Sequence, residues 1–296
     1  MLQVATLSFN APPRFAKLAA SRSFIMDAAA PAASVLSHLQ TLPPVDGYVH
    51  REFSLSGGSG RLFFSEANAR MIDAIKGRVA DWCSQSLLDP DEEAYLRATL
   101  ILAADRVANT AGTYYAHLKT LGRKALKPIE LKLPPTTASG ASGGCHNADA
   151  LTVVEATETD VLYLDPPYNE RDYAGYYHLP ETLAWGDAPV ATGRSGVPRA
   201  RTEKSRFYRT AQAANALSQI IAKAKARHIV VHYTTEGIIP HNRIVDSLGG
   251  RGRVRFEDRS VRSYTSRSSD GAKKAWHRLY WCDVEPEGAR DESPEP

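Results

Sequence analysis

The sequence predicts an α/β fold, and three features of its second half carry that prediction. The apolar run 161–164 ends at the turn-forming segment Asp165-Pro166-Pro167-Tyr168, as expected of a buried strand. An amphipathic helical pattern over 207–225 then leads into a second short apolar run at 228–233. Apolar runs at 253–257 and 275–284 predict two further strands, so strands and a helix alternate along this part of the chain.

The first half of the chain is predicted to be helical. An apolar-periodic stretch lies within 27–45 and ends at Pro43-Pro44. Ser65 is a predicted N-cap for a helix that reaches about Trp82, with its apolar residues on one side. Asp89-Pro90 predicts another helix start, because proline is favoured at the first helical position and acidic residues follow at the positive end. The core face of this helix is predicted to consist of Leu96, Leu100, Ala103, Ala104 and Val107.

Charge and cysteine content limit the possible classes of function. The formal net charge is only +3, but basic residues gather after the Asp-Pro-Pro-Tyr segment, where Arg194 and Arg199 begin one cluster, and again over 251–278. Such clusters suit a phosphate backbone, and the alternative is a solvated basic surface. The three cysteines are widely spaced and indicate neither a disulfide framework nor a metal site. No apolar run reaches the roughly 18 residues of a membrane span.

The Asp-Pro-Pro-Tyr segment suits methylation of an exocyclic amine on a base. The lone pair of such an amine is delocalised into the ring, so two acceptors are needed to draw it out. The Asp165 carboxylate and the Pro166 carbonyl supply them, and Pro167 helps to fix the turn. Asp165 is also placed to accept the proton, and Tyr168 to stack on a base flipped out of a duplex. The alternative is a Pro-Pro turn in which Asp165 caps a backbone group.

The residues after this segment carry a family resemblance. Residues 169–182 continue with asparagine, arginine, spaced tyrosines from Tyr173 onward, Tyr177-His178 and a Glu-Thr pair. In this they resemble the D12 class of adenine-specific DNA methyltransferases. Three more blocks resemble the same family, in the same order: 61–75, 105–114 and 232–240. The resemblance covers about residues 45 to 283, and the Asp-Pro-Pro-Tyr segment alone is shared with RNA guanine-N2 methyltransferases.

The resemblance implies a Rossmann-like S-adenosylmethionine-dependent methyltransferase fold with a helical target-recognition insert. It places base or DNA contacts at Tyr173 and Tyr233, and target recognition over 108–145. In that segment Asn109, Lys119, Arg123 and Lys124 are candidates for reaching base edges or phosphates. Asp149 is the candidate for the cofactor's adenine amino group, and Asp165 is also a candidate for contact with the cofactor. Three alternatives stay open: a helical cap that merely packs over 108–145, a capping role for Asp149, and a core role for Tyr233.

The chain departs from the family at its start. The family begins with a strand and a Phe-x-Gly-x-Gly loop that holds the cofactor, and residues 1–45 contain neither. The cluster Gly57-Gly58-Ser59-Gly60 follows no apolar run, so a flexible loop is favoured over a cofactor loop. We therefore expect an N-terminally incomplete fold, with Met1 to about Arg22 unrelated to the family or Met26 as the true start. The expected domains are an atypical segment 1–45, a helical region 46–144, a catalytic core 145–284 and a disordered tail 285–296.

The resulting prediction is an adenine-N6 DNA methyltransferase of a restriction–modification system. Its implied cofactor is S-adenosylmethionine, with no metal. Its expected partners are double-stranded DNA and either a cognate restriction endonuclease or a complementing N-terminal polypeptide, with no membrane. Its expected location is the bacterial cytoplasm, at the nucleoid. Two alternatives stand beside it: an inactive, truncated or split methyltransferase, and an RNA base-amine methyltransferase.

Overall fold

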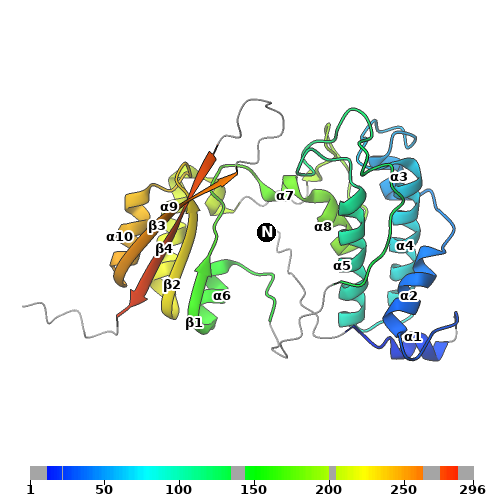
Figure 1. Ribbon diagram of the computed structural model, residues 1–296, viewed down its shortest axis with the longest axis horizontal. Coiled ribbons are helices and arrows are strands. Elements are labelled where there is room, and N and C mark those ends of the chain that lie inside the picture. The colour runs from blue at the N-terminus through cyan, green and yellow to red at the C-terminus, as the bar shows by residue number, and fades with distance from the viewer. Residues whose placement is uncertain (1–11, 22, 135–143, 200–204, 263–273, 286–296) are drawn as a thin grey trace, which may run out of the picture. The chain divides into compact units, whose positions relative to one another are not determined.

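A computed structural model describes residues 12–21, 23–134, 144–199, 205–262 and 274–285 (Figure 1). The expected disordered tail lies outside this range except for residue 285. The chain forms two compact units. We call the one formed by 146–172 and 203–296 the sheet unit, and the one formed by 2–145 and 173–202 the helical unit. Residues 173–202, assigned from sequence to the core 145–284, thus belong to the helical unit.

The sheet unit contains a four-stranded mixed sheet, which confirms the predicted α/β class (Figure 1). Its strands are β1 (Glu158–Leu164), β2 (Lys225–Thr234), β3 (Gly252–Arg262) and β4 (Lys274–Val284), in the order β1-β2-β4-β3. β1 and β2 are parallel, and the other two pairs are antiparallel. The helices of this unit are α6 (Ala150–Ala156), α9 (Thr210–Lys223) and α10 (His241–Gly249), preceded by the 3₁₀ helix η2 (Arg206–Tyr208).

Helices cover one face of this sheet. Alternate residues of β2 and β4 are buried against α9 and α10, and these are Ile229, Val231, Tyr233, Tyr280 and Cys282. The prediction that 161–164 forms a buried strand is correct for the strand and wrong for its burial. Val161 is 53% exposed and Tyr163 is 57% exposed. The reason is that β1 is an edge strand in the described sheet, and its alternate side chains point away from the helix-covered face.

The helix predicted over 207–225 begins later than expected. Ser205 caps the short helix η2, and Arg209 is extended, so that α9 starts only at Thr210. The predicted apolar stripe, Phe207, Ala211, Ala214, Leu217, Ile221 and Ala224, is wrong at Ala211, which is exposed. Phe207, Leu217, Ile221 and Ala224 are buried as predicted, and Ala213, Ala216 and Ile220 are buried with them.

The helical unit is built on two long helices whose predicted starts are confirmed. They are α4 (Glu66–Ser84) and α5 (Pro90–Val107). The Ser65 hydroxyl accepts a hydrogen bond from the Asn68 N–H at 3.3 Å, and Asp89 forms a capping box with Glu92. A cap of this kind stabilises a helix by about 1 kcal/mol. The shorter helices are α1 (Ala16–Ser21), α2 (Pro31–Gln40), α3 (Tyr48–Phe53), α7 (Tyr173–Tyr176) and α8 (His178–Trp185).

The core of the helical unit takes residues from far apart in the sequence. Leu179 and Leu183 of α8 are buried in the same cluster as Tyr95 and Leu96 of α5. The segment before Arg22, expected to be unrelated to the family, contributes Phe15 and Leu18, which are 0% and 1% exposed in that cluster. The three cysteines of the chain are unpaired. None of the helices in the described ranges is long and apolar enough to cross a membrane.

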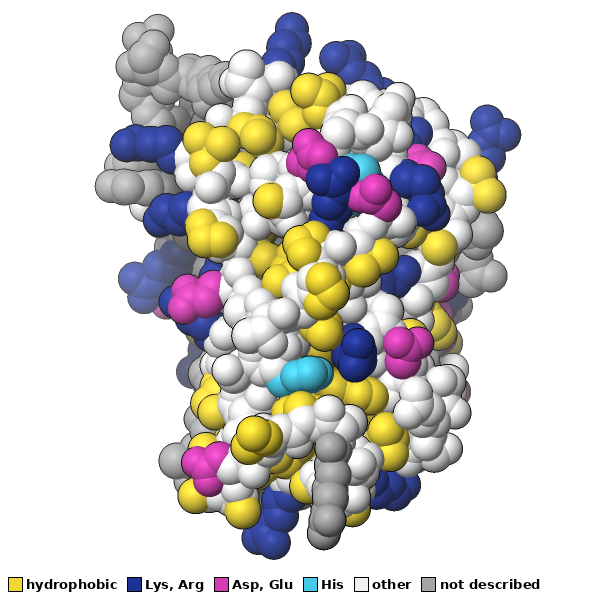
Figure 2. Space-filling view, turned by 90° about the vertical axis from the view of Figure 1, so that its right-hand side faces the viewer, with side chains coloured by type: hydrophobic (Ala, Val, Ile, Leu, Met, Phe, Trp, Pro, Cys, Tyr) yellow, Lys and Arg dark blue, Asp and Glu magenta, His cyan; other side chains and the backbone are white. Residues whose placement is uncertain are grey.

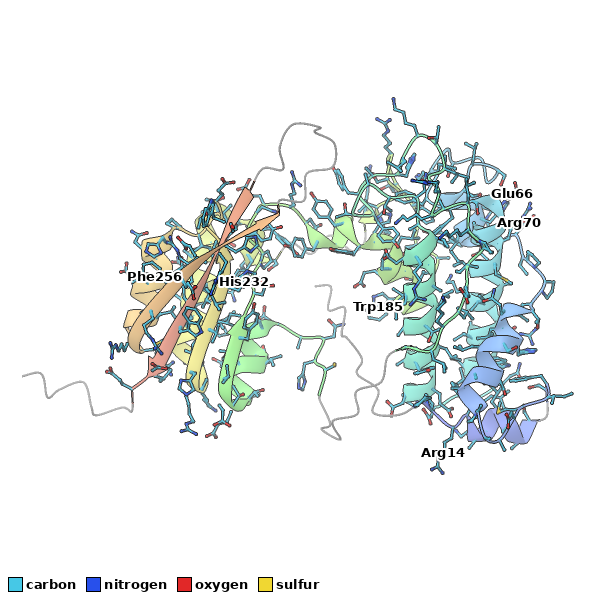
Figure 3. All side chains as sticks on the ribbon, viewed as in Figure 1. Arg14, Glu66, Arg70, Trp185, His232 and Phe256 are labelled. Atoms are coloured by element: carbon cyan, nitrogen blue, oxygen red, sulfur yellow. The ribbon has the colours of Figure 1, made fainter. Side chains whose placement is uncertain are left out.

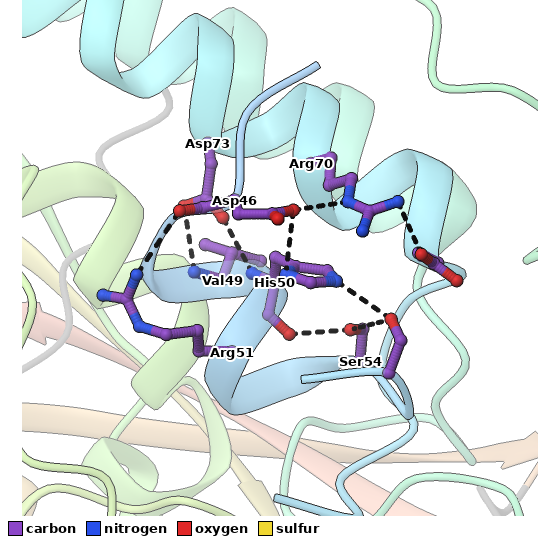
Figure 4. A network of polar contacts seen from close by, with 9 residues as sticks. Asp46, Val49, His50, Arg51, Ser54, Arg70 and Asp73 are labelled. Carbon is purple, nitrogen blue, oxygen red and sulfur yellow. Dashed lines mark hydrogen bonds and ion pairs between the residues drawn. The ribbon is translucent and has the colours of Figure 1, made fainter. Parts of the chain in front are cut away.

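A buried carboxylate joins α3 to α4 (Figure 4). Asp73 accepts hydrogen bonds from the backbone N–H groups of Val49 at 2.9 Å and His50 at 2.7 Å. These donors lie in the first turn of α3, where a helix has N–H groups without internal partners. Burial raises the pKa of Asp73 above its ordinary value. Nearby, Arg70 bridges Asp46 and Glu66 on the surface (Figures 3 and 4).

Candidate active site

The Asp-Pro-Pro-Tyr segment begins directly after the last residue of β1. This strand runs parallel to β2, and ligands of open α/β sheets bind beyond the carboxyl ends of such strands. The Asp165 side chain is 61% exposed, and Tyr168 is 42% exposed. Within the described part of the chain, no group donates a hydrogen bond to the Pro166 carbonyl. The carboxylate, the free carbonyl and the aromatic ring are therefore all available to a ligand.

The turn is anchored by the loop that follows β2. The Ile238 N–H donates to the Tyr168 carbonyl at 3.1 Å. The Tyr233 hydroxyl lies 3.5 Å from the Pro167 carbonyl and accepts a hydrogen bond from the Ile239 N–H at 3.2 Å. These contacts fix the backbone on the carboxyl side of Pro166 without occupying its carbonyl.

Tyr233 lies in the core rather than at the exposed turn. Its side chain is 2% exposed, and burial raises the pKa of its hydroxyl. It belongs to the helix-covered face of the sheet, which favours the core alternative left open by the sequence. Its contact with Pro167 nevertheless gives it an indirect role, because it supports the turn that carries Asp165.

Asp149 caps a short helix. Its carboxylate accepts a hydrogen bond from the Leu151 N–H at 2.9 Å, at the start of α6. This is the capping alternative named in the sequence analysis. The side chain is exposed. The structure adds a neighbour of Asp165 that sequence reasoning missed: the Nδ1 atom of His232 lies 3.2 Å from the Asp165 Oδ1. No local sequence signal predicts this contact, because it depends on the register between β1 and β2.

The candidates in the helical unit separate into buried and exposed residues. Asn109 is fully buried, and its amide donates to the Leu62 carbonyl at 2.9 Å and accepts from the Gly122 N–H at 3.0 Å. The structure thus gives Asn109 a packing role, which is the alternative that the sequence left open for this segment. Lys119 and Arg123, on the same loop, are exposed, as is Lys124. Arg194 and Arg199 are also exposed, and Tyr173 is half-buried in α7.

The structure brings two of these loops together. The Ser195 hydroxyl donates to the Tyr115 carbonyl, and the Tyr114 N–H donates to the Tyr176 carbonyl at 2.9 Å. Arg61 holds the same loop by donating to the Gly193 carbonyl at 3.0 Å. Arg194 therefore lies next to the segment predicted to read the target. Tyr115, which was not singled out from the sequence, is 58% exposed there and contacts the Tyr176 ring at a centroid distance of 5.4 Å.

Four basic residues of the cluster over 251–278 have partners among the described residues. Arg255 pairs with Asp283 at 2.9 Å, Arg259 with Glu257 at 2.6 Å, and Arg278 with Asp258 at 2.5 Å. Arg251 donates to the carbonyls at the end of α9. These four side chains therefore have partners within the sheet unit, and the assignment of this cluster to a phosphate backbone stays a prediction. Lys and Arg side chains elsewhere are interspersed with acidic and apolar ones, as Figure 2 shows for one face.

Comparison with known families decides the assignment. The model of the D12 class of N6 adenine-specific DNA methyltransferases matches residues 28–246, more than half of the chain. The chain belongs to this family. The matched region contains Asp165-Pro166-Pro167-Tyr168 and His232, and it ends before β3 and β4.

Among curated proteins, the chain is 34% identical over 209 residues to the type II methyltransferase M.NlaIII of Neisseria lactamica, covering 70% of this chain and 62% of that protein. It is 32% identical over 237 residues to M.FokI of Planomicrobium okeanokoites, covering 79% and 37%. It is 28% identical over 242 residues to M.CviAII of Paramecium bursaria Chlorella virus 1, covering 81% and 71%. The chain thus spans less than two thirds of the first two relatives. No solved structure matches it significantly.

A D12 methyltransferase needs a site for a methyl donor as well as a site for the amine. The described residues account for the amine side and for only part of a donor site. The strand–glycine loop–helix unit that holds a nucleotide-type cofactor is not found in the described ranges. The cluster at 57–60 forms a loop of the helical unit, and a Cβ on Gly57 would lie 2.1 Å from the His50 carbonyl, so this glycine serves close backbone packing. The described residues therefore support chemistry at the acceptor amine.

Proposed function

We propose that this chain methylates the N6 amine of adenine in double-stranded DNA, with S-adenosylmethionine as the donor, as the modification half of a bacterial restriction–modification system in the cytoplasm. The proposal rests on family membership and on one structural observation. The Asp165 carboxylate is exposed at the carboxyl end of a parallel strand, next to a Pro166 carbonyl without a hydrogen-bond donor. The relatives are named as type II methyltransferases, and a nuclease partner is part of the same proposal.

The acceptor half of the site supplies two oxygens to an amine. Asp165 and Pro166 accept hydrogen bonds from the two N–H groups of N6, which localises the lone pair on nitrogen as it attacks. The acceptors gain most as positive charge develops there, which is the condition for electrostatic catalysis. Asp165 then takes the proton that the nitrogen must lose, and Tyr168 stacks on the flipped base. When bound, the donor supplies an electrophilic methyl group.

The exposed basic residues of the helical unit would hold the DNA. Lys119, Arg123, Arg194 and Arg199 are the side chains we assign to phosphate contacts, and the exposed Tyr115 adds an aromatic surface beside Arg194. Tyr173, half-buried, is assigned to the substrate side of α7. Phosphate contacts position a protein on a duplex without reading its sequence.

A transfer assay with labelled donor tests the proposal. Unmethylated duplex DNA should become labelled on adenine N6, and Asp165→Ala should lower the rate by at least about 10²-fold while filter retention of DNA stays near that of the wild type. Asp160→Ala is the matched control, since Asp160 is an exposed carboxylate on the same strand, and it should leave transfer unchanged. Label on structured RNA alone would replace our proposal with the RNA alternative.

A split arrangement is the second candidate, because β1 leaves both an edge and a face open in the described sheet. Here a further segment or a separate polypeptide would complete the donor site. Calorimetry with S-adenosylmethionine separates the two cases. Heat of binding with this chain alone supports autonomous activity, whereas no heat at millimolar donor supports the split arrangement.

A further inference from the structure

Three titratable side chains form a continuous chain on the sheet unit. The Asp165 Oδ1 lies 3.2 Å from the His232 Nδ1, and the His232 Nε2 lies 2.8 Å from the His277 Nδ1. The two imidazole rings are 4.9 Å apart between centroids. His232 belongs to β2 and His277 to β4 (Figure 3 labels His232). The carboxylate assigned to the reacting amine is thus connected through two rings to a second strand.

Strand register explains why these side chains meet. β2 and β4 pair His232 with Leu279 and Thr234 with His277, so the two histidines are diagonal neighbours on one face of an antiparallel pair. β1 pairs Tyr163 with Val230, and Asp165 follows two residues later on the same side. This is the face that α9 and α10 leave open. The family model ends at residue 246, so His277 lies outside the matched region.

We propose that His232 and His277 are positioning residues that orient Asp165 and carry away the proton it receives during methyl transfer. This inference rests on the proposed function. In the reaction the new N–C bond forms as the methyl group leaves its donor, and the amine proton passes to Asp165. The Asp165 proton then moves to the His232 Nδ1, the Nε2 proton of His232 moves to the His277 Nδ1, and the Nε2 proton of His277 passes to water. Asp165 is left ionised, and each ring now carries its proton on Nδ1. Proton exchange of both rings with water restores the starting tautomers before the next turnover.

Proton transfer from Asp165 through His232 to His277 requires that the two rings can accept a proton. A nitrogen–nitrogen hydrogen bond needs one ring as donor and the other as acceptor, so the two imidazoles cannot both be charged. Burial and the neighbouring His232 lower the pKa of His277, whereas the Asp165 charge acts in the opposite direction. His277 is therefore kept neutral near neutral pH and can accept a proton.

The other titratable groups near Asp165, His232 and His277 are either neutral or paired with another residue. Burial and the Asp165 charge raise the pKa of Tyr163, whose ring lies 6.4 Å from the His232 ring, so it stays protonated. Arg278, next to His277 on β4, pairs with Asp258 of β3 and contacts His241 of α10. Arg259, opposite His277 in register, pairs with Glu257. Among the residues that the structure describes, this leaves Asp165 as the acidic partner of the two histidines.

Single-turnover methyl transfer measured against pH tests the catalytic side of the inference. The wild-type rate should fall as pH drops below the ordinary imidazole value of about 6.5, because the pKa of His277 lies under that value and a protonated His277 cannot accept the proton. His232→Gln and His277→Gln should each lose this pH dependence and slow transfer at neutral pH by on the order of tenfold. His228→Gln is the control, since His228 lies on the same strand but next to Asp283. Variants with the wild-type rate and profile would overturn the proton route.

Nitrogen NMR titrations of the histidine rings test the coupling of Asp165, His232 and His277 without any turnover. His232→Gln should raise the pKa of His277, and Asp165→Asn should lower it, because the two neighbours act in opposite directions. If neither variant shifts the His277 titration in an enzyme that methylates DNA, Asp165, His232 and His277 are not coupled, while the proposed function stands. Coupled titrations in a protein that transfers no methyl group would instead overturn the proposed function, and with it the use of the chain as a proton route.

Discussion

The Tyr233 hydroxyl lies 3.5 Å from the Pro167 carbonyl, so a buried residue of β2 supports the turn that presents Asp165. Tyr233→Phe keeps the ring and removes this contact together with the acceptor for the Ile239 N–H. We expect the free energy of unfolding to fall by about 1–3 kcal/mol and methyl transfer to slow, since the turn loses its support. Denaturant unfolding and single-turnover rates measure the two effects.

A second buried tyrosine provides the control for this prediction. Tyr280 is 3% exposed in the same unit, and its hydroxyl contacts the His241 Nδ1 at 3.0 Å, away from the turn. Tyr280→Phe should lower stability by a similar amount and leave the transfer rate of the folded enzyme unchanged. Equal loss of transfer in both variants would show that Tyr233 acts through stability alone.

Gly237 gives Tyr233 the room it needs. A Cβ at this position would lie 2.3 Å from the Tyr233 Cε1, so Gly237→Ala must displace the ring or the loop. We expect a destabilisation of about 1–3 kcal/mol from overpacking, measured by thermal or denaturant unfolding. A Cβ at Gly249 in the same unit would have no heavy atom within 4 Å, so Gly249→Ala should have little effect on stability. A Gly237→Ala protein as stable as the Gly249→Ala protein contradicts this account.

Local sequence signals predicted the elements that depend on neighbouring residues. The Ser65 cap and the Asp89 capping box involve residues three positions apart, so the starts of α4 and α5 followed directly from sequence. Burial of β1 depends instead on its place at the edge of the sheet, which no local pattern reveals. The start of α9 depended on the backbone of Arg209, which the apolar periodicity of the segment does not encode.

The site divides in the same way. Asp165 and Tyr168 were found because their chemistry is contained in four consecutive residues. The role of Asn109 depends on carbonyls and amides 9 to 47 residues away, and the contact between Asp165 and His232 depends on strand register. The pairing of Arg278 with Asp258 is also a product of register between β3 and β4. Contacts of this kind require the fold before they can be predicted.

Asp73 is expected to stabilise the start of α3. Asp73→Ala removes the acceptor of two backbone N–H groups and should lower the free energy of unfolding by about 1–3 kcal/mol. Asp81→Ala on the same helix is the control, because the Asp81 side chain is exposed. Denaturant unfolding of both variants at neutral pH measures the difference in the free energy of unfolding. Equal stability of the two variants would show that water replaces the carboxylate without loss of stability.

The raised pKa of Asp73 also predicts a pH dependence. A folded-state pKa above the unfolded value, 3.8, means that the folded protein binds the proton more tightly than the unfolded chain. The contribution is therefore complete below pH 3.8 and is lost as pH rises through the folded pKa. The stability of the wild type relative to Asp73→Asn should fall as pH rises across this window. A difference that grows with pH would show that hydrogen bonding, and not burial, dominates this carboxyl.

The last prediction separates DNA contacts from packing in the loop over 108–125. Lys119 and Arg123 are exposed, so replacing both with alanine should weaken DNA binding without changing stability. It should also make the dependence of log affinity on log salt shallower by about 2, since each phosphate contact contributes about 0.9. Lys132→Ala is the control, because Lys132 already pairs with Glu130. Asn109→Ala should instead lower stability by about 1–3 kcal/mol, because it unpairs buried backbone groups. If the double variant keeps the wild-type salt slope, Lys119 and Arg123 do not contact the phosphate backbone, and their assignment to phosphate contacts fails.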